Sequence, residues 1–141
     1  MSDVLVDSSV WIDFFRKKSS PEGEALDRLL EENRVCTVDL IKVEIVGGAK
    51  TLQQFEDLKS YFDALPLLEE PQGLWENMMH LQFNLHRKGI QGVGIPDLMI
   101  AVMAQTYHKV IFTRDHDFKR IRNVFPIQLM ELNVNQNRTK E

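Results

Sequence analysis

Short apolar runs alternate along the chain with longer amphipathic segments. Three of these runs are typical of buried strands and cover residues 4–6, 35–38 and 110–113. Residues 64–68 and 127–130 predict a short edge strand and a last strand. Pro66 argues against a central position for the first of these two, because proline donates no hydrogen bond to a neighbouring strand.

Between the runs, apolar residues recur at spacings of three and four, which predicts helices. The expected helices cover residues 10–15, 24–32, 39–46, 51–62, 71–88, 95–104 and about 118–121, with a turn at 19–23. Strands that alternate with helices imply a parallel sheet covered by helices on both faces. The carboxyl ends of its strands then share one edge, where ligands of open α/β sheets bind.

The expected helix at 71–88 carries two apolar stripes. One consists of Leu74, Met78, Leu81 and Leu85, and the other of Trp75, Met79 and Phe83. A helix on the surface of a monomer needs only one stripe. The second therefore indicates either an interface with another chain or burial of the helix on two sides within the monomer.

The length of 141 residues predicts one domain, which we place at residues 1–132, followed by a polar tail at 133–141. Hydrophobic residues make up 43% of the chain, enough for a folded globular protein. No apolar run approaches the roughly 18 residues of a membrane span, and the N-terminus lacks the basic region of a signal peptide. Cys36 is the single cysteine. These features predict a cytoplasmic protein without a disulfide.

The net charge of −4 excludes a protein that coats nucleic acid by charge alone. Basic residues nevertheless cluster at 16–18, 87–88 and 114–122. Such clusters are either solvated helix ends or, if acidic residues gather in one pocket, seats for a phosphate backbone beside it.

Four acidic residues are expected at the carboxyl edge of the sheet. Asp7 and Asp115 follow the first and third clear strands, Asp97 opens the helix before the latter, and Glu44 lies one turn into the helix after residues 35–38. Clustered carboxylates repel one another and recruit a cation, and their hard oxygens suit Mg²⁺ or Mn²⁺.

Each acid also has a purely structural interpretation. Asp7 would serve as a helix N-cap, Asp97 as a first-turn partner of the helix dipole, and Asp115 or Asp117 as the cap of the last helix. Glu44 is the hardest to explain in this way, because it lies inside a helix between apolar neighbours. By the same reasoning, Asp39 is expected to be a cap and Asp13 to face solvent.

Other catalytic arrangements lack support. The sequence has no Gly-x-Ser-x-Gly motif and no glycine-rich phosphate loop. Its four histidines have no metal-ligand pairing, and Cys36 stands alone in an apolar strand. A receiver or phosphatase of similar topology would need Asp-x-Asp after the first strand, where Asp7-Ser8-Ser9 stands instead.

Four segments together resemble a PIN-domain ribonuclease, and within that group a VapC-type toxin of a toxin–antitoxin pair. They are residues 6–13 (Val-Asp-Ser-Ser-Val-Trp-Ile-Asp), the Glu44 segment ending in Gly47-Gly48, and residues 96–101 and 112–118. They follow the family's order over nearly the whole chain. The first and last are the more specific.

The resemblance implies a three-layer α/β/α sandwich with a central, mostly parallel sheet, and a Mg²⁺- or Mn²⁺-dependent endoribonuclease. Asp7, Glu44, Asp97 and Asp115 fall on the family's acidic positions, and Asp117 competes with Asp115 for the last of them. Asp115 is favoured because it lies nearer the strand end, which leaves Asp117 to cap the last helix. Asp7 and Asp97 would bind the principal metal ion, with Glu44 and Asp115 completing the pocket directly or through water.

The resemblance also assigns supporting residues. Ser8 or Ser9 and Thr113 stand where the family uses hydroxyls to orient the first acid or a metal-bound water. Three basic residues are candidates for contacts to the substrate phosphate, namely Arg114, Arg16 and Lys17.

Family members are usually homodimers and are held inactive by a cognate antitoxin, whose C-terminal segment lies along a groove by the active site. The Trp75, Met79 and Phe83 stripe and the helix at 52–62 are candidates for these contacts. Two alternatives remain open. One is a PIN nuclease of RNA processing that is not a toxin, and the other is a PIN-like domain that binds RNA or a partner without cutting.

Overall fold

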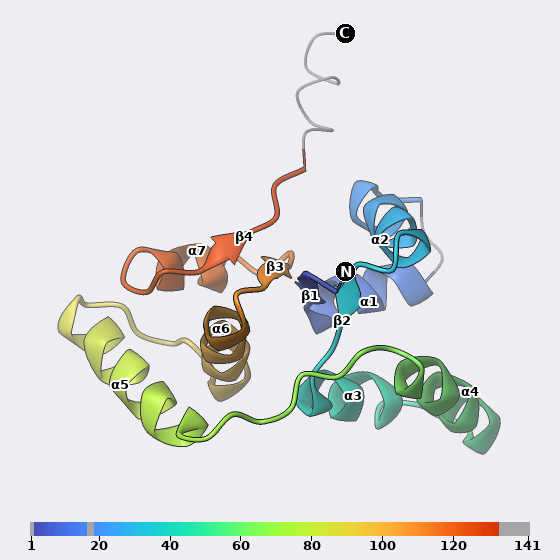
Figure 1. Cartoon of the computed structure of the whole chain (residues 1–141), viewed down its shortest axis with the longest axis horizontal. Helices are drawn as coiled ribbons and strands as arrows, with labels where there is room; N and C mark the ends of the chain where they lie inside the picture. The colour runs from blue at the N-terminus through green and yellow to red at the C-terminus, as the bar shows by residue number, and fades with distance from the viewer. Residues whose placement is uncertain (1, 17–18, 133–141) are drawn as a thin grey trace, which may run out of the picture.

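A parallel sheet of four strands forms the centre of the computed structural model, which describes residues 2–16 and 19–132 (Figure 1). Its strand order is β2-β1-β3-β4. The strands are β1 (Val4–Val6), β2 (Val35–Cys36), β3 (Val110–Phe112) and β4 (Gln128–Leu129). The helices are α1 (Ser8–Phe15), α2 (Pro21–Glu31), α3 (Asp39–Val46), α4 (Leu52–Asp63), α5 (Leu74–Arg87), α6 (Ile95–Tyr107) and α7 (Asp117–Arg122). The expected tail at 133–141 lies outside the described residues.

The strand order explains how the helices cover the sheet. The chain moves from β1 to β2 in one direction and from β2 past β1 to β3 in the other. Because parallel crossovers are right-handed, the two connections cover opposite faces. Figure 1 accordingly shows α5 and α6 side by side on one side of the sheet and α2 on the other. The α/β fold with a parallel sheet is thus confirmed.

The core combines the central strands with an aromatic cluster. All three residues of β1 are fully buried, and Ile111 and Phe112 of β3 are at most 1% exposed. Trp11 of α1 is also fully buried and stacks on Phe15, with its ring centroid 4.8 Å from that of Phe62 in α4. These contacts fix α1, which follows β1 directly, against α4.

Several elements differ from the expectation, and three of the differences have a clear local cause. Helix α2 already begins at Pro21, because the Ser20 hydroxyl caps it by accepting from the backbone N–H of Gly23 at 2.9 Å. Residues 64–68 form no strand, only a single parallel bridge between Leu67 and Thr37. Helix α5 starts at Leu74 rather than at residue 71, since Gly73 takes a left-handed conformation (φ 81°) just before it.

Helix α6 lies directly against the sheet, as its small residues predict. Ala101 and Ala104 are 0% and 1% exposed, so both small side chains are buried beneath neighbouring elements. The helix ends at His108, whose left-handed backbone (φ 57°) is the conformation that a glycine would adopt more readily. None of the described helices is both long and apolar enough to cross a membrane.

Candidate active site

Three carboxylates meet at the carboxyl edge of the sheet. Asp97, Asp115 and Asp117 each place one oxygen within 4.8 Å of the others, and all three side chains are half-buried. Asp97 lies in the first turn of α6, Asp115 in the loop after β3 and Asp117 at the start of α7. Residues at the start of α6 and just after β3 thus reach one point.

The structure distinguishes the two competing aspartates. Asp115 Oδ1 accepts the backbone N–H of Asp117 at 2.9 Å, so Asp115 rather than Asp117 satisfies the free amide at the start of α7. Asp117 instead pairs with Arg120 at 2.9 Å, and Arg120 also donates to the carbonyl oxygen of Gln91. The expectation that Asp117 caps this helix is therefore wrong.

Asp7 lies beside this cluster and is held by two hydroxyls. It occupies the N-cap position of α1, but its side chain makes no capping hydrogen bond. Instead, Ser9 Oγ and Thr113 Oγ1 both donate to Asp7 Oδ2 at 2.8 Å. Only 6% of Asp7 is exposed, so these hydroxyls supply hydrogen bonds that water would otherwise provide. The capping interpretation does not account for this carboxylate.

Glu44 stands at the margin of the site. It lies on α3, is exposed, and accepts a hydrogen bond of 2.6 Å from Ser8 Oγ at the start of α1. It is not part of the group formed by the three aspartates. Ser8 and Ser9 therefore serve different acids, which the sequence could not distinguish.

The pKa of Asp97 is raised to about 7, because burial disfavours its charged form and the negative charges of Asp115 and Asp7 add to that effect. Asp117 contributes in the same direction. A carboxylate whose charge is opposed by three neighbouring acids is one that a cation would stabilise.

The residues present fit a divalent cation. Three carboxylate oxygens within 4.8 Å of one another form an all-oxygen donor set, which suits Mg²⁺ or Mn²⁺ rather than a softer metal. Within this group, Arg120 already neutralises part of the charge on Asp117, which leaves Asp97 and Asp115 as the stronger candidates.

A family model described as "PIN domain" matches residues 4–124. The chain belongs to the PIN domain family. Among its relatives, ribonuclease VapC11 of Mycobacterium tuberculosis is 27% identical over 128 residues, which cover 89% of this chain and 96% of that protein. Ribonuclease VapC21 of the same species is 30% identical over 98 residues, which cover 68% of this chain and 71% of the relative.

Solved structures share the fold of this PIN domain. The DNA-bound VapBC complex of Salmonella typhimurium contains a chain that matches with a TM-score of 0.72 and 21% identity, covering 92% of this chain and 98% of that one. VapBC-1 of nontypeable Haemophilus influenzae matches with a TM-score of 0.71 and 18% identity, over 91% and 96% of the two chains.

The basic residues expected near the site of the PIN domain behave differently from one another. Arg114 forms an ion pair with Asp13 at 3.1 Å, Arg16 is exposed, and Lys17 lies outside the described residues. Asp13 does not face solvent as expected, since only 8% of it is exposed. The neighbours along the sequence could not have shown this, because Glu44 also has apolar neighbours on both sides and is exposed.

Replacing Thr113 with valine should lower the rate of RNA cleavage about tenfold at unchanged fold, as loss of a group that orients a metal ligand usually does. Valine keeps the shape of threonine but removes one of the two donors to Asp7 and the acceptor of the Asp115 backbone N–H. The measurement is the initial rate on a labelled RNA. Thr106→Val, which removes only a bond to the carbonyl of Val102 on α6, is the matched control. Wild-type activity of Thr113→Val would contradict this role.

Proposed function

We propose that this PIN domain is a metal-dependent endoribonuclease that hydrolyses RNA phosphodiester bonds and acts in the cytoplasm as the toxin of a toxin–antitoxin pair. One observation carries the proposal: three carboxylates lie within 4.8 Å of one another beside the buried Asp7. The names of the relatives, ribonuclease VapC11 and ribonuclease VapC21, support RNA as the substrate.

The residues of the site have separate tasks in this proposal. Asp97 and Asp115 hold a Mg²⁺ or Mn²⁺ ion, with Asp7 fixed beside them by Ser9 and Thr113. A bound divalent ion lowers the pKa of water and offsets negative charge on the phosphodiester. Glu44, which accepts a hydrogen bond from Ser8, adds a further negative charge at the margin of the substrate site.

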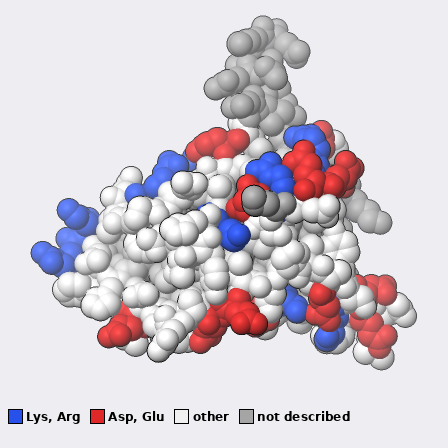
Figure 2. Space-filling model, in the orientation of Figure 1, with Lys and Arg blue, Asp and Glu red and all other residues white. Residues whose placement is uncertain are grey.

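The overall charge gives no general attraction for RNA. On the face drawn in Figure 2, basic and acidic side chains lie in small separate groups and form no continuous basic surface. The net charge of −4 agrees with this distribution. In this proposal the metal ion binds the scissile phosphate, with the exposed Arg16 as a further candidate contact.

Two apolar surfaces are available for protein partners. A groove of about 490 Å³ borders Glu44 and is lined by residues of α1, α3 and α4, among them Ile12, Phe15 and Leu58. We assign the antitoxin to this groove, because a segment bound there would contact Glu44 at the margin of the acidic site.

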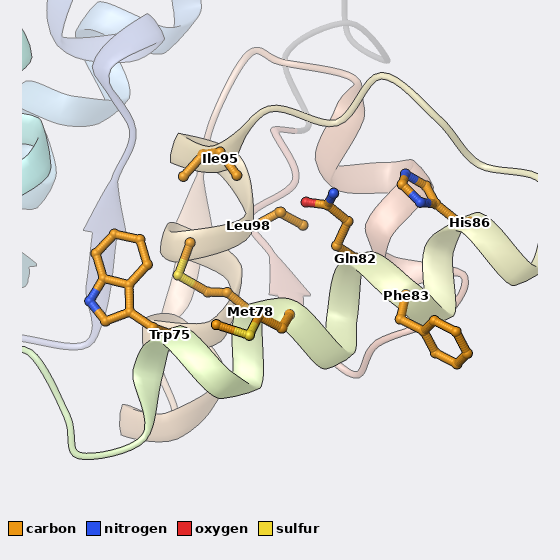
Figure 3. A pocket seen from close by; sticks show the side chains of 8 residues that line it. Trp75, Met78, Gln82, Phe83, His86, Ile95 and Leu98 are labelled. Atoms are coloured by element: carbon orange, nitrogen blue, oxygen red, sulfur yellow. The ribbon is translucent and has the colours of Figure 1, made fainter.

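The second surface is the stripe of Trp75, Met79 and Phe83, whose side chains are 49%, 67% and 59% exposed. They line a groove of about 350 Å³ whose other wall is formed by Ile95 and Leu98 of α6 (Figure 3). The stripe is thus not buried within the monomer, and we assign it to the homodimer contact.

A circular RNA incubated with the purified chain tests the enzymatic part, because only an endonuclease can open it. We expect cleavage with Mg²⁺ or Mn²⁺ and none with a chelator. Expression of the chain alone should arrest growth. RNA cleavage without growth arrest would favour a nuclease of RNA processing, and RNA binding without cleavage in either metal would favour a non-cleaving PIN-like domain.

A further inference from the structure

An ion pair between a buried carboxylate and a half-exposed guanidinium lies next to the acidic site without belonging to it. Asp13, in the last turn of α1, pairs with Arg114 at 3.1 Å, and the Asp13 side chain is only 10% exposed. The hydroxyl of Ser20, which caps α2, donates to the other Asp13 oxygen. Asp13 thus joins the end of α1, the start of α2 and the loop after β3.

The loop after β3 also carries Thr113 and Asp115 of the proposed site. The backbone N–H of Arg114 donates to Ser9 Oγ at 3.0 Å, and Ser9 in turn donates to Asp7 Oδ2 at 2.8 Å. On either side of Arg114 stand Thr113, which donates to Asp7, and Asp115, a member of the acidic cluster. A shift of Arg114 would therefore move the groups that orient Asp7 and the carboxylate of Asp115 together.

Breaking the contact between Asp13 and Arg114 costs free energy. A carboxylate as buried as Asp13 is costly unless it is paired and hydrogen-bonded, so the loop can leave α1 only by leaving that charge without its cation. The guanidinium of Arg114 is 48% exposed, which leaves part of it in solvent. If Arg114 positions the loop, replacing Asp13 should disturb the site as well. If Arg114 instead contacts phosphate directly, replacing Asp13 should have little effect.

We propose that Asp13 and Arg114 are positioning residues of the nuclease site, a role that rests on the proposed function. Their ion pair holds the loop after β3 against α1 and so sets the place of Asp115 relative to Asp7. Asp13 acts only through Arg114, because it is buried away from the substrate.

The test is a double-mutant cycle of Asp13→Asn, Arg114→Gln and the double variant. Each single variant should weaken Mn²⁺ binding, measured by calorimetry, and lower kcat by about tenfold, with KM for RNA unchanged. The double variant should be no worse than either single one, because all three remove the same interaction. Arg114→Lys keeps the charge, and its Mn²⁺ affinity should lie between those of the wild type and Arg114→Gln.

Arg34→Gln is the matched control, since it breaks an Arg–Asp pair of 2.9 Å with Asp3, whose backbone accepts from Val110 at the start of β3. It should leave Mn²⁺ binding and kcat unchanged. If Arg114→Gln raised KM while Asp13→Asn behaved as wild type, Arg114 would contact the phosphate directly and the positioning role would be wrong. An Arg114→Lys protein as defective as Arg114→Gln would also overturn it.

Amide hydrogen exchange in the metal-free protein separates this proposal from the function on which it rests. The amides of Arg114 and Asp115, which donate to Ser9 and Thr113, should exchange faster in Asp13→Asn than in the wild type. A wild-type chain that neither binds Mn²⁺ nor cuts RNA would refute the proposed function. Unchanged exchange at these two amides would refute the positioning role, whatever the activity.

Discussion

Replacing Asp97 with asparagine should abolish RNA cleavage in a protein that still folds. Asparagine keeps the size of the side chain but removes the charge that would hold the metal ion. Loss of an outer partner of a metal ligand already costs about 10- to 100-fold, so loss of a ligand should cost more than about 100-fold in kcat. The initial rate of RNA cleavage in Mn²⁺ measures the effect, and calorimetry with Mn²⁺ shows whether metal binding is lost with it.

Asp39→Asn is the matched control for this variant. Asp39 is also an aspartate in the first turn of a helix, α3, but it is exposed, and the structure makes it the first helical residue rather than the expected cap. Its replacement should leave cleavage unchanged. If Asp97→Asn cut RNA at the wild-type rate, the assignment of the site would be wrong.

The metal-free protein should become less stable as the pH rises from about 4 to about 7. In the folded state the pKa of Asp97 is about 7, against an ordinary value of 3.8, because burial and the charges of Asp115 and Asp7 oppose its ionisation. Between these two values the folded chain holds a proton that the unfolded chain has released, so the free energy of unfolding falls with rising pH. Asp97→Asn has no such proton.

Urea unfolding in a chelator, at pH 4.5 and at pH 8, measures this difference. At pH 8 Asp97→Asn should be more stable than the wild type by on the order of 2 kcal/mol, after allowance for the solvent that still reaches the carboxyl. At pH 4.5 the difference should be clearly smaller, because this pH lies less than one unit above the ordinary pKa of 3.8. Saturating Mn²⁺ should stabilise the wild type at pH 8 and leave the variant unchanged. Equal stabilities at pH 8 without metal would contradict the raised pKa.

Local patterns were enough to predict the elements near the site. Residues 4–6 appear as β1, and the apolar run before Asp115 appears as β3, because a strand buried on both faces leaves a continuous apolar run. The prediction at 64–68 was wrong because a single bridge to Thr37 satisfies that segment, and such a pairing depends on a distant part of the chain.

The sequence by itself determined the parallel sheet and the edge at which acidic residues gather, because strand–helix alternation and right-handed crossovers leave little choice of topology. Only the tertiary structure decided which acids meet. It groups Asp117 with Asp97 and Asp115, leaves Glu44 at the margin with Ser8, and buries Asp13 against Arg114. Spacing along a helix or strand fixes the direction of a side chain, whereas the partner that it reaches depends on how distant elements pack.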